Sequence, residues 1–372
     1  MRAARADMVG GRGPVARAND RGRESAPRVL VILDGASEPL GAAPTSLERA
    51  VTPTLDTLAR EGSLARVRTV APRLEAGSES AIPALLGWVP PAPVDRGLVE
   101  AAAREIAVPR DGRAWRIDVR DADDGARADA SVVRAALAAQ LPRHALHVLG
   151  GHRLLAVGRE ALPSVETLAA GLAAWSLHAL ESAAPAGAAA ASTRPARVTL
   201  HPWSEGIVPP PLLDAATVVV AAPGAAAGIA RLMGARVVTP AGATGRPGSD
   251  LAAKRRAALV AIRAGAQQIV IHVGAPDEAA HERDAAAKIA AIEAADALLL
   301  APLSEALRSV GGTLRVCPDH GCDPASGLHD ADPVPCLTWS AGRPGSGQGR
   351  LTERAVAALP VTELVPRALV AA

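Results

Sequence analysis

Aromatic residues are nearly missing from the sequence, which contains five Trp and neither Phe nor Tyr. Stacking of nucleic-acid bases on aromatic rings is therefore almost unavailable. The formal net charge is only +2, with Lys+Arg 40 against Asp+Glu 38. A dedicated nucleic-acid-binding protein normally carries a concentrated basic excess, so this near-balance argues against such a partner. Arg carries almost all the basic charge, since the only lysines are Lys254 and Lys288.

Cysteine is scarce as well, with only Cys317, Cys322 and Cys336 in the chain. Three clustered cysteines are too few for a disulfide framework. Soft metal ligation by Cys317 or Cys322 is one alternative, but the CxxC spacing of a structural zinc site is absent. We therefore expect all three to be small core residues.

Long apolar runs are also missing. No uncharged apolar stretch reaches the roughly 18 residues of a membrane span, so we expect none. Residues 1–27 lack the apolar segment of a secretory signal. We expect a disordered tail there, with a transit peptide as the alternative, and we expect a cytoplasmic protein in a reducing environment.

What the sequence does contain is an alternation of buried strands and amphipathic helices. The run RVLVILDG from Arg28 is typical of a buried strand, and ATVVVAA, QQIVIHV and GTLRVCP have the same character further along. Helical stretches, including residues 281–311, separate several of these strands. The alternation predicts an α/β fold with a mainly parallel sheet.

The middle of the chain is less regular than the two ends. It holds a helix at 132–141, a strand pair at 144–150 and 152–158, a polar turn region at 118–131, and an Ala-rich connector at 182–197 that we expect to be a loop. We therefore predict a discontinuous core of residues 28–97 and 206–372, interrupted by a smaller inserted α+β domain at 98–205.

Acidic and imidazole side chains follow the predicted strands, where open α/β sheets place their functional sites. Six of them carry the argument: Asp34, Asp277, His281, Asp319, His320 and His329. Mixed carboxylate and imidazole ligation is typical of Mn, Zn and other divalent metals. One such pair alone is more often a salt bridge or a loop cap, but the combination favours a metal site.

The spacings within this set carry further expectations. Asp277 and His281 are four residues apart, which suits ligands on one face of a helix. Asp319 and His320 are adjacent on an extended strand end, so we expect them to point apart and to bind different ions.

A candidate nucleophile, Ser78, follows Gly77 at a predicted helix start. Free N–H groups and the helix dipole stabilise a phosphoryl group at such a position. The alternative is that Ser78 is only an N-cap. Next to a divalent ion, a serine can be activated without a histidine base.

These segments together resemble the archaeal-type, cofactor-independent phosphoglycerate mutases of the alkaline-phosphatase superfamily. The matching motifs lie in the family's order over most of residues 28–340: VLVILDG, LERAVTPTLDTLAREG, GSESAIPALLGWVP, PAGATG, WSEG, HVGAPDEAAH and PDHGCDPASGLHDADPVP. The resemblance implies an alkaline-phosphatase-like three-layer sandwich.

The resemblance also implies a chemistry. Ser78 would take the phosphoryl group from one substrate hydroxyl, forming a phosphoserine, and return it to the neighbouring hydroxyl. This would interconvert 3-phosphoglycerate and 2-phosphoglycerate without 2,3-bisphosphoglycerate. Two divalent ions, Mn, Zn, Co or Mg, are implied. Their ligands would be Asp34, Ser78, Asp319 and His320 for one ion, and Asp277, His281 and His329 for the other.

Three basic residues complete the resemblance: Lys254, Arg153 and Arg116 would hold the charge of a small phosphorylated metabolite. A solvated surface charge is an equally open role for either arginine. Lys288 lies on the helix after His281, where we expect a surface pair with a nearby Glu.

The inserted domain departs from the family, because its arginine-rich stretch has no clear counterpart in residues 118–130 and a later segment is replaced by the Ala-rich connector. If glycerate is not retained, water would take the phosphoryl group. A phosphatase, or another phosphomutase, is therefore the alternative function. A catalytically silent binding protein is disfavoured, because it has no need for mutually repelling buried carboxylates.

Overall fold

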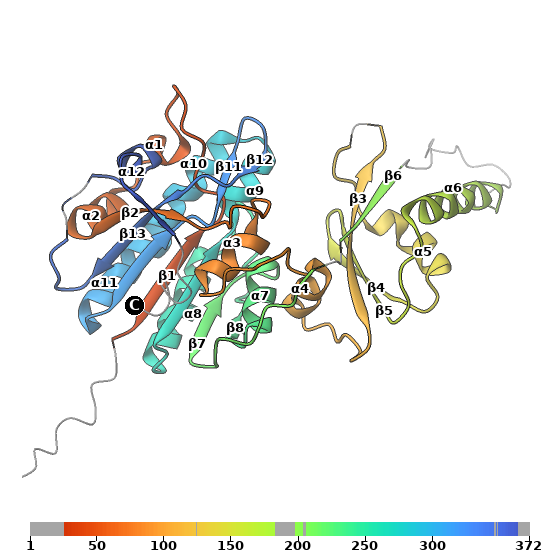
Figure 1. Ribbon diagram of the computed structural model, residues 1–372, viewed down its shortest axis with the longest axis horizontal. Coiled ribbons are helices and arrows are strands. Elements are labelled where there is room, and N and C mark those ends of the chain that lie inside the picture. The colour runs from red at the N-terminus through yellow and green to blue at the C-terminus, as the bar shows by residue number, and fades with distance from the viewer. Residues whose placement is uncertain are drawn as a thin grey trace, which may run out of the picture.

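A computed structural model of the chain describes residues 26–123, 125–182, 198–203, 206–345, 347 and 349–363. The expectations for the N-terminal tail up to residue 25 and for the connector at 183–197 lie outside these residues. Among the helices of the described part, none combines the length and apolar character needed to cross a bilayer. Two sheets dominate the structure (Figure 1).

The larger sheet has eight strands and is mainly parallel. Strand β13 is the exception, antiparallel to both of its neighbours. In spatial order the strands are β14 (Val361–Glu363), β2 (Ser63–Arg68), β13 (Val334–Ser340), β10 (Thr313–Cys317), β1 (Arg28–Leu33), β9 (Gln268–Val273), β7 (Thr217–Val220) and β8 (Arg236–Val238). The predicted α/β class is thereby confirmed.

Helices cover both faces of this sheet. Successive strand residues point to opposite faces, so β1 feeds two hydrophobic cores, one through Val29 and Val31 and the other through Leu30 and Ile32. The first core packs against α1 (Ser46–Arg49), α2 (Pro53–Glu61), α8 (Leu251–Arg263), α10 (Ala285–Ala294) and α11 (Ala301–Val310). The second packs against α3 (Ser78–Leu85), α4 (Arg96–Ala103) and α7 (Ala225–Leu232). The result is a three-layer sandwich.

The helical stretch predicted after residue 281 is divided in the structure. A π-helical turn, Ala295–Leu300, joins α10 to α11. Within it the buried Asp296 accepts hydrogen bonds from the backbone N–H groups of Thr54 at 3.1 Å and Leu55 at 2.7 Å. This side chain caps the start of α2, whose sequence opens with Pro53, and so ties two distant segments together.

The smaller sheet is antiparallel, in the order β4 (Ala145–Gly150), β5 (Arg153–Gly158), β3 (Arg113–Asp121) and β6 (Val198–Trp203). Helices α5 (Ser131–Gln140) and α6 (Val165–Ser182) accompany it. The predicted strand pair and helix are confirmed. Strand β3 extends into residues expected to be a turn, and α6 was not predicted, because its sequence is apolar without a clear stripe.

Helix α4 lies between the two sheets and packs against both α7 and β3 (Figure 1). The approach to β3 is close enough to require glycine at position 97. A Cβ on Gly97 would lie 1.9 Å from the backbone oxygen of Ala114. The remaining elements are α9 (Ala275–His281), α12 (Glu353–Val356) and the hairpin of β11 (Gly321–Asp323) and β12 (Leu328–Asp330).

Replacing Gly97 with alanine tests this junction. We expect Gly97→Ala to lower the free energy of unfolding by about 1–3 kcal/mol, because α4 must move away from β3. Gly41→Ala is the matched control, since no heavy atom lies within 4 Å of its added Cβ. Urea unfolding measures both variants, and equal losses of stability would contradict the prediction.

Candidate metal centre

Three aspartates meet at one edge of the large sheet. Asp34 follows β1, Asp319 follows β10, and Asp277 lies in α9, which begins just after β9. These three strands are neighbours and parallel, so their carboxyl ends meet at the same place. Gly35 allows the approach: its φ is +59°, and a Cβ there would lie 2.4 Å from Asp277 Oδ1.

The first group of candidate ligands is Asp34, Asp319 and His320, all buried, with donor atoms within 4.8 Å of one another. His320 Nε2 lies 3.5 Å from Asp34 Oδ1 and 3.5 Å from Asp319 Oδ2. The expectation that Asp319 and His320 point apart is therefore wrong. The chain bends at Asp319 and His320 and is not extended there. The N–H groups of Gly35 and His320 both donate to Asp319 Oδ1, at 3.0 Å.

The second group is Asp277, His281, His329 and Cys322, again within 4.8 Å of one another. His281 Nε2 lies 3.3 Å from Asp277 Oδ2, and His329 Nε2 lies 3.2 Å from Asp277 Oδ1. Asp277 and His281 share one face of α9, as their spacing predicted. The two rings are oriented by backbone carbonyls, because His281 Nδ1 is 2.9 Å from Gly327 O and His329 Nδ1 is 3.0 Å from Ala76 O.

The two groups adjoin each other, and Ser78 stands beside the first. The His329 ring centroid is 4.2 Å from that of His320. Ser78 Oγ donates to Asp34 Oδ1 at 3.3 Å and lies 3.5 Å from His320 Nε2. Gly77, not Ser78, is the N-cap of α3. The capping alternative for Ser78 is therefore wrong, and its hydroxyl faces the candidate ligands.

The donor set fits divalent cations. Asp319 is fully buried, and its Oδ2 has no hydrogen-bond partner; Asp277 Oδ1 is likewise without a hydrogen bond of good geometry. Burial and the neighbouring carboxylates of Asp319 and Asp277 raise the pKa of Asp34 well above its usual value. Unpartnered, mutually repelling carboxylate oxygens in a buried site are compensated by bound positive charge.

His272 and Lys254 lie behind the first group. His272, in β9, has its Nε2 3.0 Å from Asp34 Oδ2 and so supports that candidate ligand. Lys254 is fully buried, and its Nζ donates to the backbone oxygen of His272 at 2.7 Å. Burial outweighs the attraction of Asp34 and lowers the pKa of Lys254 to about 8.

Lys288 contradicts its expected surface position, because it is fully buried. Its Nζ donates to the backbone oxygens of Cys322 at 2.6 Å and Ser37 at 3.2 Å, and pairs with Glu38 at 2.9 Å. The lysine therefore ties the loop after β1 to β11. The sequence alone could not reveal the burial of Lys288, because α10 has no pattern of charged residues that separates an exposed face from a buried one.

The two expected arginines are both held by acidic partners. Arg116 is buried and paired with Asp118 at 2.7 Å and Glu100 at 3.3 Å. Arg153 Nη2 reaches across from β5 to Glu278 Oε1 in α9, at 3.3 Å. Arg153 thus lies beside the second group, whereas Arg116 belongs to a buried ion-pair network.

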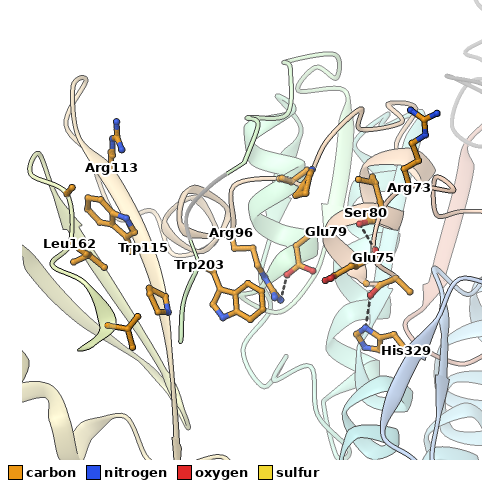
Figure 2. Close-up of a pocket in the computed structure, with 18 of the residues that line it drawn as sticks. Arg73, Glu75, Glu79, Ser80, Arg96, Arg113, Trp115, Leu162, Trp203 and His329 are labelled. Atoms are coloured by element: carbon orange, nitrogen blue, oxygen red, sulfur yellow. Dashed lines mark hydrogen bonds and ion pairs between the residues drawn. The ribbon is translucent and has the colours of Figure 1, made fainter. Parts of the chain in front are cut away.

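A cavity of about 950 Å³ lies between the two sheets and reaches Gly77 and His329 (Figure 2). The residues that line this cavity do not include Lys254, Arg153 or Arg116. Its charged and aromatic lining includes Arg73, Glu75, Glu79, Arg96, Arg113, Trp115 and Trp203. Trp115 comes from β3 and Trp203 from β6, so the small sheet supplies both rings.

Glu79 and Arg96 form a half-buried ion pair on this wall, 2.5 Å apart. Burial raises the pKa of Glu79, but Arg96 and Arg116 outweigh it and lower the pKa to about 2. Arg73 and Arg113, in contrast, are exposed and make no ion pair with any described residue. Sequence reasoning missed both, because nothing distinguishes them from the chain's other arginines.

Comparison with known proteins places these features in a family. The metalloenzyme superfamily model matches residues 26–359. The 2,3-bisphosphoglycerate-independent phosphoglycerate mutase 2 of Methanothermobacter thermautotrophicus is 29% identical over 333 residues, 79% of this chain and 83% of the relative. The corresponding mutase 1 of Archaeoglobus fulgidus is 29% identical over 362 residues, 84% of this chain and 88% of the relative.

Solved structures share the fold. A protein from Pyrococcus horikoshii gives a TM-score of 0.69 at 21% identity, covering 89% of this chain and 91% of that one. The cofactor-independent phosphoglycerate mutase of Thermoplasma acidophilum gives a TM-score of 0.56 at 16% identity, covering 92% of this chain and 98% of that one. With the family model spanning most of its length and two groups of candidate metal ligands at the carboxyl edge of its sheet, the chain belongs to the metalloenzyme superfamily.

Proposed function

We propose that the protein is a metal-dependent phosphoglycerate mutase that interconverts 3-phosphoglycerate and 2-phosphoglycerate through phospho-Ser78. One observation carries the proposal: the Ser78 hydroxyl, at the start of α3, lies 3.3 Å from a buried metal-ligand carboxylate. The relatives aligned along most of the chain are named as mutases of this kind, which supports the choice of substrate.

The two groups of ligands are proposed to hold two divalent ions. Asp34, Asp319 and His320, together with Ser78, would hold one ion, and Asp277, His281 and His329 would hold the other. Mn, Zn, Co and Mg are the candidates, and no 2,3-bisphosphoglycerate is required. When bound, the ions supply positive charge that neutralises the phosphoryl oxygens and promotes ionisation of the serine hydroxyl.

The residues of the chain then position the reaction. Ser78 Oγ forms a bond to phosphorus while the bond to the substrate oxygen breaks, and the reverse transfer delivers the phosphoryl group to the neighbouring hydroxyl. Backbone N–H groups at the start of α3 stabilise the transferred group. Glycerate must stay bound between the two transfers, which requires a closed binding surface opposite Ser78.

We propose that residues 98–205 form the domain that supplies this surface, opposite a core of 28–97 and 206–372. Arg73 from the loop before α3 and Arg113 from β3 bring unpaired guanidinium groups to opposite walls of the cavity (Figure 2). They are suited to bind the substrate carboxylate or phosphate. Lys254, Arg153 and Arg116 would act less directly, through His272, Glu278 and the buried ion-pair network.

The direct test is product analysis with a nucleophile variant. We expect Ser78→Ala to reduce formation of 2-phosphoglycerate from 3-phosphoglycerate by about a thousandfold or more, because the phosphoryl acceptor is lost. Ser309→Ala is the control, since this serine is exposed on α11 away from the cavity and its hydroxyl donates to the backbone oxygen of Ala306, at 2.7 Å. Free phosphate as the only product of the wild type would overturn the mutase assignment and favour a phosphatase.

Metal loading should depend on pH through His329. Burial lowers the pKa of His329, but the hydrogen bond and charge of Asp277 outweigh it and raise the pKa in the metal-free protein. A ligand must lose its proton to bind metal, so affinity for Zn²⁺ is expected to fall as pH is lowered from about pH 8 to about pH 5. Calorimetric titration measures this, and His329→Gln should flatten the dependence while the exposed His201→Gln leaves it intact.

The cavity arginines give a further prediction. We expect Arg113→Ala and Arg73→Ala each to raise KM for 3-phosphoglycerate about tenfold or more, because a charge-assisted hydrogen bond is lost. Arg159→Ala is the control, since Arg159 pairs with Asp111 on the exposed end of the same sheet, at 2.9 Å. An unchanged KM in both cavity variants would place the substrate elsewhere.

A further inference from the structure

Cys322 is buried among the ligands of the second group, although the sequence favoured a purely packing role. Its side chain is fully buried, and its sulfur lies within 4.8 Å of donor atoms of Asp277, His281 and His329. Burial and the charge of Asp277 both raise the pKa of the Cys322 thiol, as expected for a sulfur beside that carboxylate. The sulfur therefore faces the candidate metal position and not an apolar core.

The hairpin that carries Cys322 explains this placement. Cys322 in β11 is paired directly with His329 in β12, and directly opposed residues of an antiparallel pair present side chains to the same face. The backbone of Cys322 is fixed on both sides, since its N–H donates to Ser37 O at 2.9 Å and its carbonyl accepts from Lys288 Nζ at 2.6 Å. A buried lysine thus holds the cysteine in register with the histidine.

A second observation points to a ligand at this position. Asp277 is 8% exposed, and its Oδ1 has no hydrogen bond of good geometry although it faces the group. Donor atoms around a tetrahedral zinc ion lie roughly 3.3 to 3.7 Å apart, given metal–ligand bonds of about 2.0 to 2.3 Å. Donors already within 4.8 Å need only a small contraction to reach this geometry.

We propose that Cys322 is the fourth protein ligand of the second group and makes that site selective for zinc-like ions over manganese and magnesium. The inference rests on the metal centre of the proposed function. Two imidazoles, one carboxylate and one thiolate form a soft, four-coordinate set that suits Zn²⁺ and Co²⁺, whereas Mn²⁺ and Mg²⁺ prefer oxygen. Binding replaces the thiol proton by the metal and releases that proton to solvent.

The first group differs in character. It offers two carboxylates, one imidazole and the Ser78 hydroxyl, and none of its members is a thiol. Oxygen-rich sets of this kind accept the harder ions. The two neighbouring sites would therefore hold unlike metals, the softer ion lying on the side of α9 and the hairpin.

Cobalt spectroscopy on the full chain tests the assignment. The protein is freed of metal with a chelator, kept reduced with a phosphine, and titrated with Co²⁺. We expect a near-ultraviolet thiolate-to-cobalt band that is absent from Cys322→Ser. It should persist in Cys336→Ser, whose thiol is also buried but lies in β13 outside both groups. The preference for Zn²⁺ over Mn²⁺ should fall about tenfold or more in Cys322→Ser.

X-ray absorption at the zinc edge of the zinc-loaded wild type removes any dependence on the folding of a variant. A sulfur scatterer in the zinc shell supports the assignment, and a shell of nitrogen and oxygen alone overturns it. Cobalt binding without the thiolate band also overturns it while leaving the metal centre in place. Failure of the wild type to bind cobalt or zinc would overturn both this inference and the metal centre.

Discussion

Mutual repulsion among three buried carboxylates is the constraint around which the rest of the molecule is arranged. Asp34, Asp319 and Asp277 sit at or just beyond the ends of three adjacent parallel strands, and burial makes their charges costly to hold without compensation. The imidazoles at the same edge reduce this cost only partly, and carboxylate oxygens are left without hydrogen bonds. Bound cations would compensate this repulsion, and the composition of the site therefore fits a metal centre better than a structural ion-pair network.

Buried lysines provide the framework behind this centre. In a chain whose other basic residues are almost all arginine, Lys254 and Lys288 are both fully buried and both bond to backbone carbonyls. A compact ammonium with three donors can tie loop carbonyls together in a space where a planar guanidinium would not fit. The two lysines therefore fix the backbone that carries the ligands, and they do so without occupying the ligand positions.

The cavity beside the candidate metal centre explains how the large-sheet and small-sheet parts of the chain could both contribute to one reaction. One wall is the start of α3 with Gly77 and Glu79, and the other is the small antiparallel sheet with Arg113 and Trp115 (Figure 2). Helix α4 connects the walls through a close contact that only glycine at position 97 permits. In the proposed function the chemistry lies on one wall and substrate binding on the other, an arrangement in which a superfamily core can be kept while the binding surface changes.

Local patterning was enough to determine the α/β class, the helical pair Asp277 and His281, and the grouping of polar residues after strands, because periodicity and strand ends are properties of neighbouring residues. It did not reveal the burial of Lys288, the orientation of Asp319 with His320, or the unpaired state of Arg73. Ligation by Cys322 was one of two interpretations the sequence left open, and only the pairing of Cys322 with His329 in the β11–β12 hairpin brings its sulfur to the second group. These features depend on contacts between segments hundreds of residues apart, such as Ser37 with Lys288. Only tertiary packing decides which charges lose water and which side chains share a centre.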